Sequence, residues 1–258
     1  MGNGMIPAER QAAIEEYLWK EGFAQVEELS QLLDVSPITI RRDLDLLEKK
    51  GLLERSHGGA RSPQYLQREA LFEEKGKAHR EEKAAIGKYV AQLVQPGETI
   101  FINSGSTTRY VAAALAGRKD IRIITNNMTI LPVLSSTGGP EILVPGGLYR
   151  PQSQCLVGEE TLAYLRRVFV DRTIMGTDGL DLEKGFTSPV SQEAAVTRIM
   201  VEQCQGEVIV AADSSKIGRV SHFKTVELDD VDLVITDGGL ESSLKESFVQ
   251  VGLKIETV

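Results

Sequence analysis

The sequence predicts an α/β protein in two parts, a small helical unit with a β-hairpin and a larger domain built on a parallel sheet. Two observations support this prediction. The first 60 residues contain three short helical patterns followed by a Gly-Gly pair, and from Glu98 onward short β-branched segments alternate with helical ones. Strands that alternate with helices are typical of a parallel sheet covered by helices.

Length and composition limit the possible classes of protein. The chain has 258 residues, of which 41% are hydrophobic, enough for one large domain or for a small and a medium one. Because no apolar run reaches about 18 residues, we expect no membrane partner. Cys155 and Cys204 lie far apart and lack metal-ligand spacing. We therefore expect a reducing, cytoplasmic setting, with no metal site and no cofactor.

Two helices are expected before residue 34. Residues 8–20 predict the first, with Ile14 and Leu18 on its apolar face, and Gly22 ends it. Residues 26–33 predict the second, which begins with acidic residues that suit a helix N-terminus. A tight turn then leads into a third helix.

The third helix, residues 37–50, has clear start and stop signals. Ser36 is a good N-cap, Pro37 fits the first helical position, and Gly51 suits the residue after the last turn. A buried stripe is expected at Ile40, Leu44 and Leu47. Polar and basic residues stand at the start of the helix instead, as in a helix that enters a DNA major groove. Taken alone, the helix fits an ordinary surface helix equally well.

The segment after the third helix predicts a wing. Leu52 and Leu53 suit a short strand, and Gly58 and Gly59 suit a hairpin tip. The arrangement is typical of a winged helix-turn-helix over residues 5–61 that binds double-stranded operator DNA. For His57 the alternative is an ordinary surface or core histidine. The predicted DNA-binding residues are Ser36, Thr39, Arg41, Arg42, Arg55, His57 and Gly58.

Charge is concentrated locally rather than spread over the chain. The net charge of −8 argues against a broadly basic nucleic-acid binder. Between Ser36 and Arg61, however, the sequence has six basic and four acidic residues, so the local net charge is +2. DNA affinity would then depend on a few well-placed contacts.

Residues 62–80 are polar and charged and predict a linker. A helix is expected over residues 81–93, and Pro96 and Gly97 close it. The larger domain, residues 81–258, then contains seven predicted strands. These are residues 98–103, 121–125, 141–147, 171–179, 207–216, 231–239 and 253–258.

Polar residues follow these strands where ligands bind in parallel sheets, beyond the carboxyl ends. The SGSTT run couples glycine and hydroxyl side chains to a helix N-terminus, which favours an anion such as phosphate. Carboxylates nearby suit sugar hydroxyls. The alternatives are an ordinary helix cap for this run, and a structural salt bridge between Asp213 and Lys216; Asp237 is expected to cap a turn. The predicted effector-binding residues are Ser104, Gly105, Ser106, Thr107, Thr108, Asn126, Gly146, Gly147, Asp178, Glu193, Asp213 and Lys216.

Two sets of motifs resemble the DeoR family of bacterial transcriptional repressors. The first set is ERQ at residues 9–11 and VSPITIRRDLDLLEKKGLLERSHGGA at residues 35–60. The second set, SGSTT, TNN, GTDGLD, SQEAAV and ADSSK, is similar to the family's sensor domain, whose fold resembles ribose-5-phosphate isomerase. The resemblance implies a repressor of carbohydrate-metabolism genes controlled by a phosphorylated sugar. Because one recognition helix covers few base pairs, a homodimer or higher homo-oligomer is expected.

Two departures from the related patterns matter. Asn103 stands where the family usually has an acid before the SGSTT run, so a negative charge is lost beside the expected phosphate site. The isomerase pattern D-G-A-D-E matches residues 175–179, where Met175 and Gly179 replace two carboxylates. We therefore expect no catalysis. The competing hypotheses are a sugar-phosphate isomerase with an appended helical domain, and a regulator whose α/β domain serves only assembly.

Overall fold

The computed structural model describes residues 5–21, 23–56, 58–61, 72–135 and 138–258. The chain divides into two compact units, Met1–Glu69 and Ala70–Val258, which we describe one at a time. The predicted contact residue His57 lies outside the described residues. Among the described residues, no helix combines the length and apolar character needed to cross a membrane.

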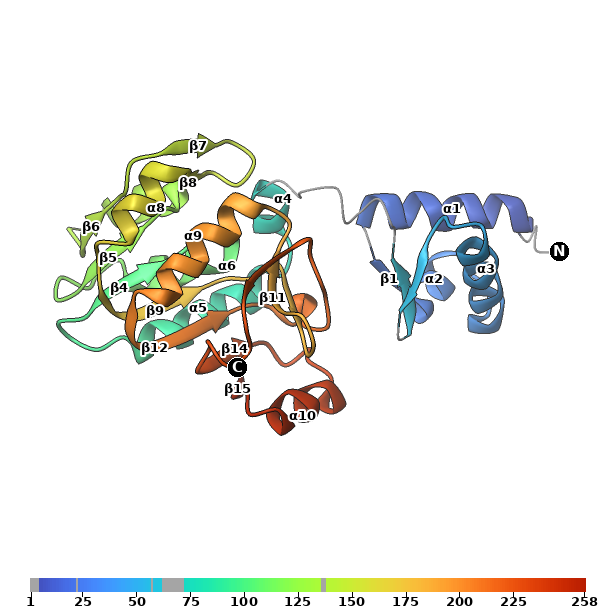
Figure 1. The fold of residues 1–258 in the computed structure, drawn as a ribbon. Coiled ribbons are helices and arrows are strands. Elements are labelled where there is room, and N and C mark those ends of the chain that lie inside the picture. Colours follow the sequence, from blue (N-terminus) through green and yellow to red (C-terminus); the bar gives the residue numbers. More distant parts are fainter. Residues whose placement is uncertain (1–4, 22, 57, 62–71, 136–137) are drawn as a thin grey trace. The chain divides into compact units, whose positions relative to one another are not determined.

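The described part of the first unit contains three helices (Figure 1). They pack with a small antiparallel sheet of order β1-β3-β2. The helices are α1 (Pro7–Glu21), α2 (Val26–Leu32) and α3 (Pro37–Lys49). The strands are β1 (Phe23–Gln25), β2 (Glu54–Ser56) and β3 (Gly59–Arg61). This is the predicted winged helix-turn-helix.

Helix α3 begins and ends as its sequence predicts. The hydroxyl of Ser36 accepts a hydrogen bond from the Thr39 backbone N–H at 3.3 Å, and Gly51 adopts the left-handed conformation, with φ of 72°. Ile40, Leu44 and Leu47 are fully buried, which confirms the expected stripe.

The wing differs from the prediction in where its first strand begins and in the number of strands in its sheet. Leu52 and Leu53 were expected to form its first strand, but β2 begins at Glu54, because Leu53 is buried in the core of the unit instead. The sheet also gains a strand, β1, which pairs with β3 and which the sequence pattern did not indicate.

The second unit contains a seven-stranded parallel sheet of order β15-β14-β12-β9-β4-β5-β6. All seven strands overlap the predicted segments, although β9 begins one residue and β12 three residues before its segment, and this confirms the α/β fold class. They are β4 (Thr99–Ile102), β5 (Arg122–Thr125), β6 (Glu141–Leu143), β9 (Val170–Met175), β12 (Cys204–Ala211), β14 (Leu233–Thr236) and β15 (Ile255–Thr257).

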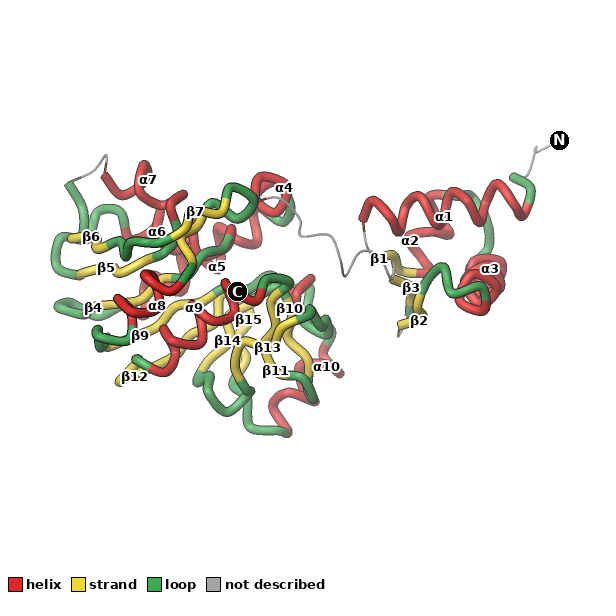
Figure 2. The backbone as a smooth tube through the Cα atoms, turned by 45° about the horizontal axis from the view of Figure 1, so that its top comes forward, coloured by secondary structure: helices red, strands yellow, loops and turns green. Residues whose placement is uncertain are grey.

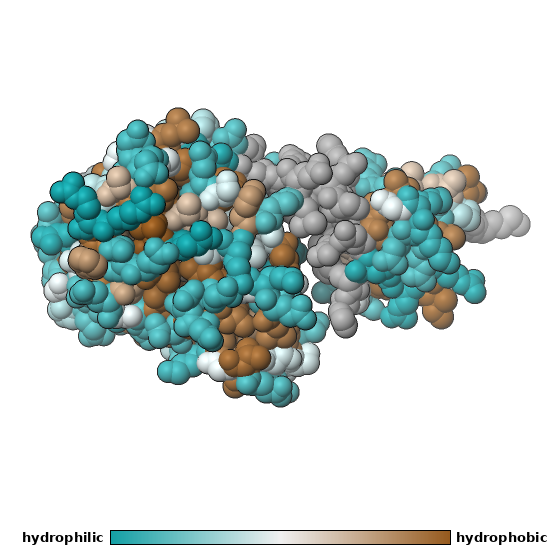
Figure 3. Space-filling model, viewed as in Figure 1, coloured by the Kyte–Doolittle hydropathy of each residue, from teal (hydrophilic) through white to brown (hydrophobic). Residues whose placement is uncertain are grey.

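Helices cover both faces of this sheet (Figure 1). On one face α5 (Arg80–Leu93), α6 (Ser106–Leu115), η2 (Met128–Ile130) and α7 (Leu131–Ser135) pack over an aliphatic core. On the other face lie α8 (Glu159–Leu165), α9 (Ser191–Glu202) and α10 (Ser242–Gln250). The short turn η3 (Ser214–Lys216) follows β12. Figure 3 shows hydrophilic residues over most of the visible surface, with hydrophobic side chains between them.

Several short elements of this unit were not predicted. They are the hairpin β7 (Leu148–Arg150) and β8 (Cys155–Val157), the antiparallel sheet β10 (Gly179–Asp181), β11 (Gly185–Ser188) and β13 (Phe223–Val226), and α4 (Phe72–Lys77) (Figure 2). Helix α4 lies in the stretch expected to be a linker. Its Phe72 side chain is buried, and its backbone N–H donates to the carbonyl of Gln152 at 2.8 Å.

Candidate functional site

A cavity lies at the carboxyl ends of β4, β9 and β12, where the loops after these strands meet. Strands β4 and β9 are neighbours in the sheet, and the chain leaves them in opposite directions, toward β5 on one side and β12 on the other. Ligands of open α/β sheets bind at such a switch point, because the loops after the two strands separate there.

One wall of the cavity is the N-terminus of α6. Ser104, Gly105, Ser106 and Thr107 line it, and the hydroxyl-bearing Ser106 and Thr107 are buried. The first backbone N–H groups of a helix have no partner within the helix and carry the positive end of its dipole, so this wall suits an anion. Thr108 does not line the cavity. Its hydroxyl donates to the Asn103 carbonyl at 2.9 Å and to the Gly105 carbonyl at 3.0 Å, which holds the turn in shape.

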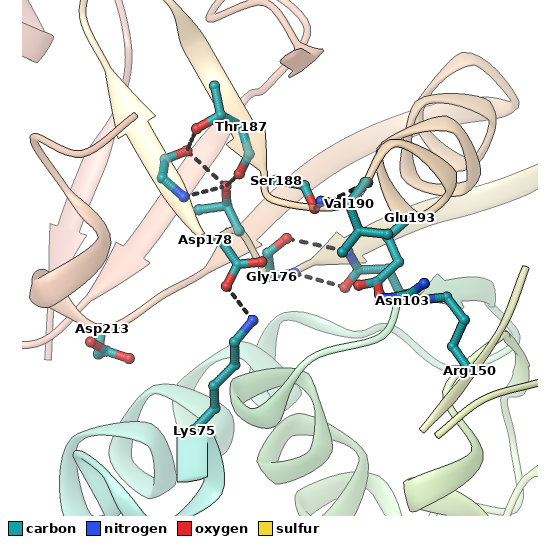
Figure 4. Close-up of polar contacts among 12 residues, drawn as sticks. Lys75, Asn103, Arg150, Gly176, Asp178, Thr187, Ser188, Val190, Glu193 and Asp213 are labelled. Carbon is teal, nitrogen blue, oxygen red and sulfur yellow. Dashed lines mark hydrogen bonds and ion pairs between the residues drawn. The ribbon is translucent and has the colours of Figure 1, made fainter. Parts of the chain in front are cut away.

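Asn103 links the ends of the two central strands (Figure 4). Its side-chain oxygen accepts from the Gly176 N–H at 2.8 Å, while its amide donates to the Gly176 carbonyl at 3.2 Å and to Thr197 Oγ1 at 3.1 Å. An aspartate could accept the first bond but could not donate the second. The amide, rather than the acid expected from related sequences, therefore satisfies both backbone groups of Gly176.

Charged side chains form the opposite wall. Lys75 of α4 donates to Asp178 at 2.6 Å, and each of these two side chains is 23% exposed (Figure 4). Lys216 lines the same cavity. Burial alone would raise the pKa of Asp178, but the neighbouring Lys75 and Lys216 ammonium groups outweigh it and hold the pKa below its usual value. Burial lowers the pKa of Lys216, with Asp178 and Asp213 opposing that shift.

A second lysine–aspartate pair lies behind this wall. Lys83, 1% exposed, donates to the carbonyls of Lys75 at 2.6 Å and Ala78 at 2.7 Å, and its Nζ is 3.7 Å from Asp213 Oδ2. Burial lowers the pKa of Lys83, and Asp213 counteracts the shift. Asp213 is fully buried and does not line the cavity.

The turn that carries Lys216 is held from the next strand. Asp237, after β14, accepts from the Ser214 N–H at 2.6 Å, from the Ser214 hydroxyl at 2.8 Å and from the Gly239 N–H at 2.9 Å. Burial would raise the pKa of Asp237, but these donors lower it on balance. This is the capping role expected for Asp237.

The remaining edge of the cavity comes from α9 and from the turn between β7 and β8. Glu193, in the first turn of α9, lines the cavity and pairs with Arg150 of β7 at 3.3 Å. Ser153 lines it from the turn. Since the adjacent Gln152 carbonyl accepts the N–H of Phe72, this turn and α4 lie side by side at the cavity.

The structure brings together part of the predicted effector-binding set. The residues that line the cavity are Ser104, Gly105, Ser106, Thr107, Asp178, Glu193 and Lys216. Besides Thr108 and Asp213, three predicted residues lie elsewhere. Asn126 donates to the Leu156 carbonyl at 3.0 Å, the Gly146 carbonyl accepts from Thr161 Oγ1 at 2.7 Å, and a Cβ on Gly147 would lie 2.1 Å from that hydroxyl. These three positions hold the loops after β5 and β6 in place.

The sequence did not predict several other residues that line the cavity. They are Phe72, Lys75, Ser153, Thr177, Thr187, Ser188, Thr197 and Thr225. Most belong to the short elements that no periodicity revealed. The available signal was the apolar pair Leu71 and Phe72 in a mostly polar stretch.

In the first unit, the predicted DNA-contacting residues of α3 share one exposed end. Ser36, Arg41 and Arg42 are exposed and Thr39 is half-buried. The Arg41 side chain, 55% exposed, lies 3.7 Å from Glu27. Beyond α3, Gly58 forms the wing turn with φ of 80°.

Arg55 is already engaged within the wing. Its Nε lies 3.3 Å from Asp45 Oδ1, and its guanidinium donates to the Gly59 carbonyl at 3.0 Å. These contacts connect the wing to α3. We therefore assign Arg55 a structural contribution in addition to the predicted contact with DNA.

A buried ion pair joins α3 to α1. Arg10 Nε of α1 donates to Asp43 Oδ2 at 2.5 Å, and Gln11 donates to the other carboxylate oxygen at 3.2 Å. Both charged residues are under 9% exposed. Both residues belong to the motifs that resemble the DeoR family, but no sequence pattern indicated this contact.

A winged helix with a basic, exposed recognition-helix end, joined in one chain to an α/β domain with an anion-suited cavity, defines a DNA-binding transcription regulator. Residues 10–65 match the family model of the DeoR-like helix-turn-helix domain, and residues 78–238 match that of the DeoR C-terminal sensor domain. The chain belongs to the DeoR family.

Curated relatives are similar to this chain over nearly their whole length. The HTH-type transcriptional regulator GlpR of Haloferax volcanii is 35% identical over 97% of this chain and 98% of its own. A putative aga operon transcriptional repressor of Escherichia coli O157:H7 is 33% identical over 96% and 93%. The glycerol-3-phosphate regulon repressor of Escherichia coli K12 is 31% identical over 98% and 98%.

The relatives carry the names of regulators, so the isomerase alternative is not favoured, and we describe the chain as a regulator and not an enzyme. Among solved structures, ribose-5-phosphate isomerase A of Methanocaldococcus jannaschii aligns with 54% of this chain and 55% of its own, at 16% identity and a TM-score of 0.41. That similarity is too low to support a statement about activity.

Proposed function

We propose that this regulator is a repressor of carbohydrate-metabolism genes, and that a phosphorylated sugar or related polyhydroxylated metabolite in the α/β cavity controls its operator binding. One observation carries the proposal. The N-terminus of α6 and two lysines, Lys75 and Lys216, face the same cavity as the carboxylates of Asp178 and Glu193. The cavity thus combines groups that bind a phosphate with groups that accept hydrogen bonds from hydroxyls.

Each part of such a ligand has a matching wall. A phosphate suits the α6 N-terminus, where backbone N–H groups and the hydroxyls of Ser104, Ser106 and Thr107 donate. Ionised carboxylates only accept hydrogen bonds, so Asp178 and Glu193 suit sugar hydroxyls. The name of one relative, the glycerol-3-phosphate regulon repressor, supports a phosphorylated metabolite in this class of regulator.

The DNA contacts that we propose lie on α3 and the wing. Ser36, Thr39, Arg41 and Arg42 occupy the exposed N-terminal end of α3, the end that reads base edges in winged helices. We further propose a homodimer or higher homo-oligomer on a palindromic operator, because two recognition helices double the contact. Sedimentation of the free and operator-bound protein tests this, and a single chain on a single half-site would contradict it.

A ligand screen tests the effector proposal. The full-length protein is heated with a panel of sugar phosphates and with the same sugars unphosphorylated. We expect the midpoint of unfolding to rise with at least one phosphate and with none of the free sugars, because binding to the native state stabilises it. No response to any phosphorylated compound would contradict the proposal.

A variant links the response to the cavity. Thr107→Ala removes one hydroxyl at the α6 N-terminus, so operator affinity should persist while the effector response is lost. Ser243→Ala, an exposed position on α10, serves as the matched control. A Thr107→Ala protein that fails to fold would favour a purely structural function for the loop.

Arginine variants test the recognition helix. Arg41→Ala or Arg42→Ala should weaken operator binding by roughly 1–3 kcal/mol if the side chain reads a base, with relaxed sequence preference. If it contacts only phosphate, all sequences should lose affinity and the salt slope should shrink by about one. Lys88→Ala, exposed on α5, is the control, and unchanged affinity in both arginine variants would contradict the assignment.

A further inference from the structure

Helix α4 is a six-residue helix with tertiary contacts at both of its ends. An isolated helix of this length is unstable in water, because too few hydrogen bonds offset its nucleation. Its first residue, Phe72, is buried and bonds to Gln152, and its end is fixed by the ammonium of Lys83, which donates to the Lys75 and Ala78 carbonyls. The position of α4 therefore depends on the groups around the cavity.

Two residues of α4, Phe72 and Lys75, line the cavity, and Lys75 is the charged one. In Figure 4 it extends from the helix to Asp178, and the two groups are 2.6 Å apart. Both line the cavity, together with Ser104, Ser106 and Thr107 from the α6 N-terminus. The Lys75 ammonium and the N-terminus of α6 therefore face the same cavity, and both favour an anion.

The Lys75–Asp178 pair is suited to exchange with a ligand. Both side chains line the cavity and retain contact with solvent, so a ligand that enters the cavity can reach both of them. A ligand that carries both a phosphate and hydroxyls offers each member a replacement, since its phosphate accepts from the ammonium and a hydroxyl donates to the carboxylate. A phosphate alone can already pair with the Lys75 ammonium, and the hydroxyls of a larger ligand add a new partner for the Asp178 carboxylate.

We propose that Lys75 is an effector-binding residue and that, through it, the occupied cavity holds α4 more firmly than the empty one. This inference rests on the function proposed above and adds a residue and a route to it. Helix α4 directly follows residues 62–71, which connect the α/β unit to the winged helix along the chain. A ligand that stabilises the position of α4 therefore also fixes the end of the segment that leads to the DNA-binding unit.

Hydrogen exchange of the full-length wild-type protein tests the route without any variant. Inorganic phosphate is the probe, because it presents the anion alone. We expect slower amide exchange with phosphate in two segments, residues 104–108 and residues 72–77. Protection of residues 104–108 with unchanged exchange in α4 would overturn this inference and leave the effector site intact. No protection in either segment would overturn both.

Lysine variants test the residue. Lys75→Met removes the charge at similar length, and Lys77→Met, exposed on the same helix, is the matched control. Loss of one charge-assisted hydrogen bond should weaken phosphate binding about tenfold or more. With the sugar phosphate found in the screen, operator affinity of Lys75→Met should no longer respond, while Lys77→Met responds like the wild type.

A charge-retaining variant guards against a folding artefact. Lys75→Arg should keep both phosphate binding and the operator response, because it keeps the cation on α4. A full response in Lys75→Met would overturn the inference, while the wild-type response would still support the proposed function. Loss of response in Lys75→Met and Lys77→Met alike would also overturn it, since the effect would then belong to the helix and not to Lys75.

Discussion

The two ends of the parallel sheet each carry a cluster of basic and acidic side chains, but the surroundings of the two clusters differ. Toward the amino ends, Arg172 of β9 pairs with Glu98 before β4, at 3.1 Å, and with Glu207 of β12. At the carboxyl ends, Lys75, Lys83 and Lys216 surround Asp178 and Asp213. The first cluster joins three strands. The second borders a cavity and has more lysines than carboxylates among these five residues.

The comparison shows what distinguishes a structural ion cluster from a ligand site. Arg172 makes its contacts with protein carboxylates, so nothing in the cluster calls for an added anion. Three members of the carboxyl-end cluster, Lys75, Lys216 and Asp178, line open space next to a helix N-terminus, and the two ammonium groups there suit an anion from solution. A ligand site therefore differs from a structural ion cluster in its exposure to a cavity and in its charge balance. The presence of charged residues alone does not distinguish them.

The largest expected effect is at the amino end. Arg172→Met leaves two carboxylates without their cation, and we expect the free energy of unfolding to fall by about 3 kcal/mol. Urea unfolding measures this. Arg166→Met breaks an exposed pair with Glu159 and should cost less than about 1 kcal/mol. Phosphate affinity should be unchanged in Arg172→Met, and a loss there would contradict the separation of the two ends.

The next effect concerns ligand binding at the carboxyl end. Asp178→Asn removes a charged acceptor for sugar hydroxyls, so affinity for the sugar phosphate should fall by roughly 1.5–3 kcal/mol. Affinity for inorganic phosphate should be equal or higher, because a negative charge is gone. Titration calorimetry with both probes separates these outcomes. A parallel loss of both affinities would show that Asp178 acts only by supporting the fold.

A pH series sharpens the difference further. Burial lowers the pKa of Lys216 from its ordinary value of 10.5, so its ammonium loses its proton at a lower pH than an ordinary lysine. Phosphate affinity should therefore fall as pH rises through that lowered pKa, by about tenfold for the lost charge. Arginine stays charged throughout, so Lys216→Arg should remove this fall. An identical fall in Lys216→Arg would contradict the assignment to Lys216.

The smallest effect concerns the turn between α4 and α5. His79 has φ of 52° there, a left-handed conformation that side chains with a Cβ rarely adopt. His79→Gly should raise the free energy of unfolding by about 0.5 kcal/mol, since relief of strain slightly exceeds the entropic cost of glycine. Thermal unfolding measures it. Glu81→Gly, within α5, should instead destabilise, and a loss in both variants would contradict the strain argument.

The sequence predicted the long and regular parts of the fold. The inner strands of the main sheet are apolar and rich in β-branched residues, as burial on both faces requires, and α3 carries clear capping residues. Three-residue strands such as β7 and β10 have no readable period, so the hairpin and the small antiparallel sheet were missed. Helix α4 was missed because its sequence, FEEKGK, is short and charged.

The candidate site was predictable where one loop makes it and not where distant segments meet. Ser104 to Thr107 follow one strand and precede one helix, so their convergence is local. Lys75 and Asp178 are 103 residues apart in the chain, and no pattern announces their contact. Conversely, Asn126 and Gly147 follow strands as binding residues do, but their side chain or missing Cβ serves loop packing. The position of a residue after a strand does not show whether its side chain lines the cavity or packs within the loop.

The buried Arg10–Asp43 pair has a consequence for how operator preference can change. Asp43 points into the unit, whereas its neighbours Arg41 and Arg42 are exposed. The support of α3 and the proposed reading surface therefore occupy different sides of one helix. New base preferences can arise by exchanging residues on the outer side, without altering the fold. In the winged helix, the residues that support α3 and the residues proposed to contact bases can therefore change independently of each other.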